Sequence, residues 1–172
     1  MKYHNFISSS ELTRVLRRFN TIMFCDKWHQ VMTSRIAFCL KGYESNKVTA
    51  TYSLDNDGSC FTMNNEYLDE RNRIKAIQGN SECTRLPTCQ TVFFPSIGIT
   101  AHYWILYISR DLSTMIVCTP FIVPPHKPKD NYGLYVLTKN PDTFWANKKL
   151  VKKIYRVLEE YKFKLALRYS GP

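Results

Sequence analysis

The segment Lys47–Leu54, KVTATYSL, decides the fold together with the two segments that follow it, Asp55–Gly58 (DNDG) and Cys60–Leu68. Apolar residues stand at every second position from Val48 to Leu54, and polar residues fill the positions between them. A strand would place these two sets on opposite faces. DNDG has the residues that a tight hairpin turn requires. The sequence therefore predicts two antiparallel strands joined by this turn.

Similar segments continue along the chain and are separated by turn signals. They are Arg71–Gly79, Thr88–Phe94, Ala101–Ile108, Leu112–Thr119 and Tyr132–Lys139. Short strands with this spacing indicate one antiparallel sheet, either a sandwich or a closed barrel. A chain of 172 residues with 44% hydrophobic content can form one compact core.

One stretch near the C-terminus has a helical pattern instead. From Asp142 to Tyr161, apolar residues recur at steps of three and four, and charged residues fill the other face. We expect this amphipathic helix to begin at Pro141 and Asp142, with the Asp142 carboxylate capping its first turn. A last strand, Phe163–Tyr169, is expected to return to the sheet.

The first part of the chain, residues 1–23, is expected to be an extension that precedes a single domain of residues 24–172. Ser8 and Glu11 have the spacing of a capping box that opens a short helix, Glu11–Arg18. The arginines of this helix also fit an organelle transit peptide, although Glu11 is unusual in one. No secretory signal is present in this chain, so we expect an intracellular or organellar protein, or a processed secreted one.

Four quoted segments resemble the lipocalin family. They are FCDKW, which contains Trp28, YWILYISRD (Tyr103–Asp111), MIVC (Met115–Cys118) and LYVLTKNP (Leu134–Pro141). The last three look like the corresponding strands of apolipoprotein D and of the bacterial outer-membrane lipocalins. The resemblance implies an all-β fold: an eight-stranded antiparallel up-and-down barrel with a C-terminal amphipathic helix. The chain is a divergent member, because several family positions differ.

Three departures from the family pattern concern one end of the barrel. Asp26 stands where lipocalins usually have Gly, and Ile108, Ser109 and Arg110 replace the usual Thr-Asp-Tyr turn. The resemblance implies that Trp28 closes the barrel floor and that Lys139 covers it, where an Arg is commoner. A lysine can still lie over an indole face.

Ligand-binding residues are also implied by the resemblance to apolipoprotein D. Position by position, they are Tyr52, Asn64, Tyr103 and Tyr135. Such a cavity would be mostly apolar with a few directed hydrogen bonds, and it would suit a fatty acid, steroid, retinoid or tetrapyrrole. The alternative is that the same rings simply fill the core. We therefore predict a carrier of a small hydrophobic ligand.

The net charge of +10 predicts a negatively charged partner. The helix contributes a basic face of five residues: Lys148, Lys149, Lys152, Lys153 and Arg156. This face is either a solvated surface or a docking site for an anionic membrane or a protein assembly, together with the loop Phe121–Asp130. The alternative function is thus a non-catalytic interaction subunit with a filled barrel. Nucleic acid is a weaker partner, because no binding motif occurs.

Cysteine, metal and catalytic patterns are uninformative. Six cysteines allow about 15 pairings, of which the spacing singles out only a local bridge between Cys83 and Cys89. No CxxC occurs and the histidines are scattered, so we expect no metal. No catalytic arrangement is evident, so we expect no enzyme and no cofactor beyond a bound lipid or other apolar molecule.

Overall fold

The computed structural model describes residues 14, 15, 17, 19, 24–33, 48–55, 60–69, 71–82, 88–120, 132–160 and 168–169. Its strands are β1 (Lys27–Thr33), β2 (Thr49–Leu54), β3 (Phe61–Leu68), β4 (Ile74–Glu82), β5 (Cys89–Phe94), β6 (Ile99–Ile108), β7 (Thr114–Pro120), β8 (Tyr132–Thr138) and β9 (Arg168–Tyr169). A short 3-10 helix, η2 (Pro95–Ile97), joins β5 to β6. The helices α4 (Pro141–Ala146) and α5 (Lys148–Glu160) follow β8.

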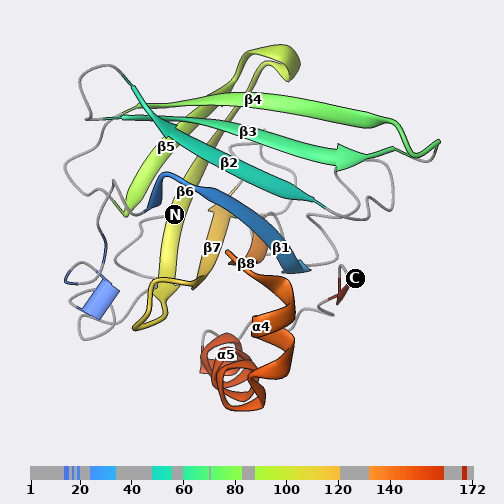
Figure 1. The fold of residues 1–172 in the computed structure, drawn as a ribbon. Coiled ribbons are helices and arrows are strands. Elements are labelled where there is room, and N and C mark those ends of the chain that lie inside the picture. The colour runs from blue at the N-terminus through green and yellow to red at the C-terminus, as the bar shows by residue number, and fades with distance from the viewer. Residues whose placement is uncertain are drawn as a thin grey trace.

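The strands form a closed antiparallel barrel (Figure 1). Each strand from β2 to β8 pairs with the next, β8 pairs with β1, and the pairing of β1 with β2 closes the barrel. The short strand β9 pairs with the far end of β1. The predicted eight-stranded barrel with a C-terminal helix is therefore confirmed.

Strand register defines the inner face of the barrel. Tyr52 lies opposite Met63, and both are buried members of the core. Met63 in turn lies opposite Gly79. Directly opposite residues share a face, so the alternating residues of these strands point inward as the KVTATYSL pattern predicts.

The barrel has two different ends. Trp28 lies at the start of β1, beside the end of β2, because Lys27 pairs with Thr51. We call this the Trp28 end; the turns from β2 to β3 and from β6 to β7 also lie there. The turn from β3 to β4 and the η2 helix lie at the opposite end, which we call the rim end.

Several strands begin later than predicted, and β4 differs most. It begins at Ile74 rather than Arg71 because Asp69 organises the preceding turn. The Asp69 carboxylate accepts hydrogen bonds from the backbone N–H groups of Arg71 and Arg73, both at 2.9 Å. Asn72 has a left-handed φ of 56°. These contacts fix a turn where the sequence pattern predicts a strand.

The predicted helix is divided into two. Asn147 has non-helical backbone angles after α4, and its side chain accepts a hydrogen bond from the backbone N–H of Leu150 at 3.0 Å. The expected cap was also wrong: Asn140, not Asp142, accepts from the backbone N–H of Thr143. An asparagine side chain competes well for the unsatisfied amides of a first turn, so each Asn begins a new helix.

Helix α5 packs on the outside of the barrel, below it in Figure 1. Its residues Ile154, Val157 and Leu158 are buried in the core. The ammonium of Lys153 lies 5.5 Å from the centre of the Tyr107 ring on β6. Within the described residues, no helix is long and apolar enough to cross a membrane.

The N-terminal helix is seen only in part. Arg14, Val15 and Arg17 have helical backbone, and Val15 is buried in the core. The predicted Ser8–Glu11 capping box and the residues Phe163 to Leu167 of the last strand lie outside the described residues. The proposed division at residue 23 stays a prediction.

The disulfide pairing differs from the local Cys83–Cys89 bridge considered above. Cys60 is disulfide-bonded, whereas Cys25, Cys89 and Cys118 are thiols. A bridge between Cys83 and Cys89 is therefore absent. Burial raises the pKa of the Cys89 thiol, which disfavours the reactive thiolate.

Candidate functional site

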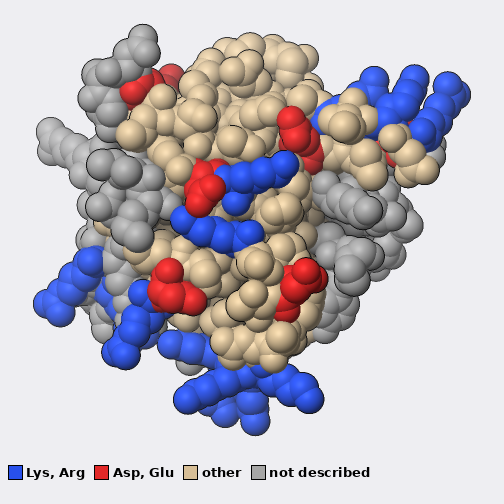
Figure 2. Space-filling model, in the orientation of Figure 1, with Lys and Arg blue, Asp and Glu red and all other residues tan. Residues whose placement is uncertain are grey.

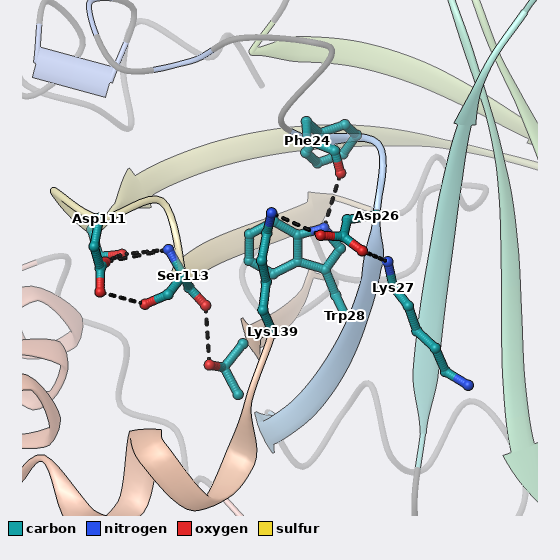
Figure 3. A network of polar contacts seen from close by, with 9 residues as sticks. Phe24, Asp26, Lys27, Trp28, Asp111, Ser113 and Lys139 are labelled. Atoms are coloured by element: carbon teal, nitrogen blue, oxygen red, sulfur yellow. Dashed lines mark hydrogen bonds and ion pairs between the residues drawn. The ribbon is translucent and has the colours of Figure 1, made fainter.

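The Trp28 end is closed by a buried indole with specific partners (Figure 3). Trp28 is 1% exposed, and its Nε1 donates a hydrogen bond to the carbonyl oxygen of Phe24 at 2.9 Å. The Lys139 ammonium lies 5.3 Å from the centre of the Trp28 ring. It also forms an ion pair with Asp26, with 2.8 Å between Nζ and Oδ2. Lys139 thus covers the indole while its charge is paired.

The Lys139 hydrogen bond lowers the pKa of the Asp26 carboxyl below its usual range. The pair therefore contributes stability at neutral pH, and this contribution is lost as the pH falls through the lowered pKa. Both side chains are partly exposed, so its contribution is small, about 0.2–1 kcal/mol. The pair links two departures from the lipocalin pattern, because an acid at position 26 gives the lysine at 139 a fixed partner.

A second polar network at this end was missed by sequence reasoning. In the turn after β6, the Ser109 hydroxyl donates to Asp111 at 2.5 Å, and Asp111 also accepts from the Ser113 hydroxyl at 2.8 Å. The Ser113 carbonyl then accepts from the backbone N–H of Lys139 at 2.9 Å and from the Thr138 hydroxyl at 3.0 Å. The alternating Ser-x-Asp-x-Ser pattern is the available signal, because such side chains bond nearby backbone in turns.

Aromatic rings fill the interior next to the Trp28 end. The Tyr52 and Tyr103 hydroxyls are hydrogen-bonded to each other across the barrel. The Phe24 ring lies 4.3 Å from that of Tyr52 and 6.4 Å from that of Tyr103, between centroids. Phe61 packs edge-on against Phe24 at 5.1 Å. Part of the predicted calyx is therefore occupied by the chain itself.

Tyr135 is the third interior tyrosine and lies nearer the rim end. It is partly exposed, and no hydrogen bond joins its hydroxyl to the described residues. Gly133, two residues earlier on the same face of β8, makes room for its ring. A β-carbon at Gly133 would lie 2.7 Å from the Tyr135 hydroxyl oxygen and 2.9 Å from ring carbon Cε2. The missing side chain at Gly133 thus sets the position of the Tyr135 phenol.

The structure does not bring Asn64 to these tyrosines. Asn64 pairs with Thr51, whereas Tyr52 pairs with Met63. Asn64 therefore lies on the outer face of β3, where its amide donates to Glu66 at 3.2 Å. The inner position beside Tyr52 belongs to Met63, which is 2% exposed.

The polar groups of the core carry no charge. The buried polar residues in the described part of the chain are Gln30, Thr33, Thr88, Gln90, Ser109, Thr114, Thr119 and Thr138. Burial raises the pKa of Tyr52, Tyr103 and Tyr135 above the usual tyrosine value. These phenols therefore stay neutral and can donate hydrogen bonds at physiological pH.

Exposed large apolar side chains gather toward the rim end. Ile74 begins β4, Ile97 lies in η2 and Ile99 begins β6, with 73%, 51% and 39% exposure. Phe93 is also 41% exposed, but its side chain stands on the outer face of β5 and is not part of this isoleucine edge. An apolar edge around one end of a barrel is the expected surrounding of an entrance for apolar molecules.

The basic face of α5 is exposed, although the Lys153 ammonium also lies over the Tyr107 ring. All five predicted residues, Lys148, Lys149, Lys152, Lys153 and Arg156, are exposed. In Figure 2, basic side chains gather at the bottom of the molecule, where Figure 1 has α5. The loop Phe121–Asp130 lies outside the described residues. Across the described residues, no group of three or more His, Cys, Asp or Glu side chains is placed to hold a metal ion.

An antiparallel barrel closed by a tryptophan at one end, with phenols inside it, has the architecture of a calyx. Residues 23–157 match the family model described as a lipocalin-like domain. The chain belongs to this lipocalin family. No curated protein matches the sequence.

Solved structures with a similar fold include crustacyanin subunits. Lobster apocrustacyanin A1 has a TM-score of 0.65 at 13% identity, with 99% of this chain and 94% of that chain covered. Apocrustacyanin C1 has a TM-score of 0.65 at 12% identity, with 92% and 83% covered. Apocrustacyanin C2 has a TM-score of 0.62 at 13% identity, with 90% and 81% covered. At this identity, the likeness shows the fold alone. The predicted resemblance to apolipoprotein D and the bacterial lipocalins stays a prediction.

Proposed function

We propose that this protein is a non-catalytic carrier that binds one small hydrophobic molecule in the rim half of its barrel. The observation that carries the proposal is the Tyr135 phenol. It faces the interior, keeps partial exposure and has no hydrogen-bond partner among the described residues. A partly open apolar interior with one unused donor is the usual character of a small-molecule site.

The proposed ligand lies above the aromatic cluster formed by Phe24, Tyr52, Phe61 and Tyr103. This cluster leaves less depth than an empty eight-stranded barrel would provide. The exposed isoleucines around the rim end support entry from that side. Steroids and retinoids fit the proposal, because each has an apolar ring system that can lie against the aromatic groups of the barrel.

Replacing Tyr135 with alanine is expected to weaken binding of the apolar dye Nile red about tenfold, equivalent to about 1.4 kcal/mol. The ring would be lost from the wall of the proposed site while the strand pairing remains. Dye fluorescence titration measures the affinity, and circular dichroism checks the fold. Phe93→Ala is the matched control, because Phe93 is an exposed aromatic on the outer face of β5. Equal affinity for the wild type and Tyr135→Ala would refute the assignment.

A second candidate is an interaction subunit whose barrel is filled. Two observations favour it: the aromatic cluster occupies part of the interior, and α5 offers a continuous exposed basic face. In this function the basic face docks on an anionic membrane or an acidic protein surface.

Charge reversal by Lys148→Glu, Lys149→Glu and Lys152→Glu is expected to release this protein from phosphatidylserine vesicles if the second candidate is right. The loss of binding follows from repulsion between the new carboxylates and the anionic lipid. Vesicle cosedimentation at about 0.1 M salt measures the bound fraction. Charge reversal at three exposed basic residues outside α5, by Lys27→Glu, Arg71→Glu and Lys75→Glu, changes the net charge by the same amount and is the matched control. An equal effect of both sets would leave only nonspecific attraction.

A further inference from the structure

The hydroxyl of Thr33 is an unexplained polar group inside the barrel. Thr33 is the last residue of β1 and is 2% exposed. Among the described residues, its Oγ1 has no hydrogen-bond partner. Burying a hydroxyl without a partner costs stability, and valine would fill the same volume without this cost. A threonine at this position therefore calls for a function that the folded chain alone does not supply.

Thr33 lies directly opposite Tyr135 in the pairing of β1 with β8. The two residues share the inner face, because Tyr135 and its neighbour Gly133 both face the interior. Opposite residues in an antiparallel pair have β-carbons about 4.5–5.5 Å apart. Two oxygen-bearing side chains without partners thus stand side by side in the rim half of the barrel.

The chemistry of the surrounding core limits what these two groups can hold. Every buried polar residue in the described part of the chain is uncharged. The nearest phenols, Tyr52 and Tyr103, are already bonded to each other. The Lys139 ammonium lies at the other end of the barrel and is paired with Asp26. Among the described residues, no Lys or Arg side chain is buried in the core, and Lys75, in the inward-facing register of β4, is exposed at the rim. A carboxylate buried beside Thr33 and Tyr135 would therefore lose its hydration with no buried cation among these residues to offset the loss.

We propose that Thr33 and Tyr135 form a polar anchor for the uncharged oxygen of an apolar ligand, such as an alcohol or a ketone, and that the site disfavours carboxylates. This inference rests on the proposed carrier function and narrows its ligand class. It favours hydroxylated or keto-bearing steroids and retinoids over fatty acids. Thr33 and Tyr135 each supply a hydroxyl that can donate or accept.

Retinol and retinoic acid test the proposal, because they share one apolar skeleton and differ in the terminal group. At pH 7.5 we expect the wild-type protein to bind retinol at least tenfold more tightly than retinoic acid. Thr33→Val is expected to weaken retinol binding three- to tenfold and to change retinoic acid binding less than twofold. Thr62→Val, on the outer face of β3, is the matched control. Quenching of intrinsic tryptophan fluorescence measures the affinity of each of the three proteins for each of the two ligands.

Stability gives an independent readout. Thr33→Val is expected to keep or raise the urea midpoint, because it removes an unpartnered buried hydroxyl, whereas a structural hydroxyl would lower the midpoint when removed. Tighter or equal binding of retinoic acid, an unchanged affinity of Thr33→Val for retinol, or a lowered midpoint would each overturn the anchor. If retinol and retinoic acid bind equally and Nile red still binds, the carrier function stands without the anchor. If none of the three probes binds the folded protein, the carrier function itself fails.

Discussion

Trp28→Ala is expected to lower the free energy of unfolding by about 3–5 kcal/mol, the range for removing a buried large aromatic ring. The indole is 1% exposed, so its loss leaves a cavity that the β1 and β2 backbones cannot close. The carbonyl of Phe24 also loses its donor, and Lys139 loses the ring that it covers. Urea denaturation followed by far-ultraviolet circular dichroism measures the change.

Two milder variants separate the contributions at this end of the barrel. Trp28→Phe keeps an aromatic ring and removes the Nε1 hydrogen bond, so we expect a smaller loss, about 1–2 kcal/mol. Lys139→Met keeps most of the side-chain stem and removes the charge. We expect it to cost about 1 kcal/mol or less, because the ion pair and the cation–π contact are partly exposed. A cost of Trp28→Ala no greater than that of Lys139→Met would mean that the indole does not close the barrel.

The strand pattern could be predicted from the sequence because each strand has one buried face. Val48, Ala50 and Tyr52 are all buried, as the alternation in KVTATYSL predicts. Alternation is a local property of the sequence, so it does not depend on which strand lies alongside. Helix boundaries depend on single capping contacts, so the break at Asn147 and the cap at Asn140 did not follow from the period of the apolar residues.

The site was only partly predictable because it depends on which residues become neighbours. Asn64 was transferred from a family position, and a shift of one residue moves a side chain to the other face of a strand. The pairing of Tyr52 with Met63 shows that Met63 faces the interior. Because side chains alternate along β3, Asn64 must then lie on the outer face. The Asp26–Lys139 pair joins the residue before β1 to the residue after β8, and these are far apart in sequence. The sequence marks each of them as unusual but does not connect them.

Phe24 is the residue whose importance sequence analysis missed most completely. It lies in the same FCDKW segment as Trp28, yet nothing local indicates that it points into the barrel. In the structure its ring is 2% exposed and packs against Phe19, Tyr52 and Phe61. Its position follows from the chain entering β1 across the barrel floor. A residue of this kind decides how much of the calyx is left for a ligand.

Phe24→Ala is expected to lower the free energy of unfolding by about 3–5 kcal/mol, because the surrounding rings can collapse only partly into the space. The remaining cavity would be lined mainly by the aromatic rings of Tyr52, Phe61 and Tyr103. Cavities of this kind stay dry and take up small apolar molecules such as benzene. A ligand that binds only the folded state raises its stability by mass action.

Benzene should therefore raise the urea midpoint of Phe24→Ala and leave the wild type and Phe93→Ala unchanged. Phe93→Ala is the matched control, because it removes an exposed ring from the outer face of β5 and creates no cavity. A benzene response in Phe24→Ala alone would mean that the natural ring fills the floor of the calyx, which leaves the ligand only the rim half beside Tyr135. A benzene response of the wild type as large as that of Phe24→Ala would mean the opposite: the barrel is already open toward Trp28, and the carrier has a deep pocket rather than a shallow one.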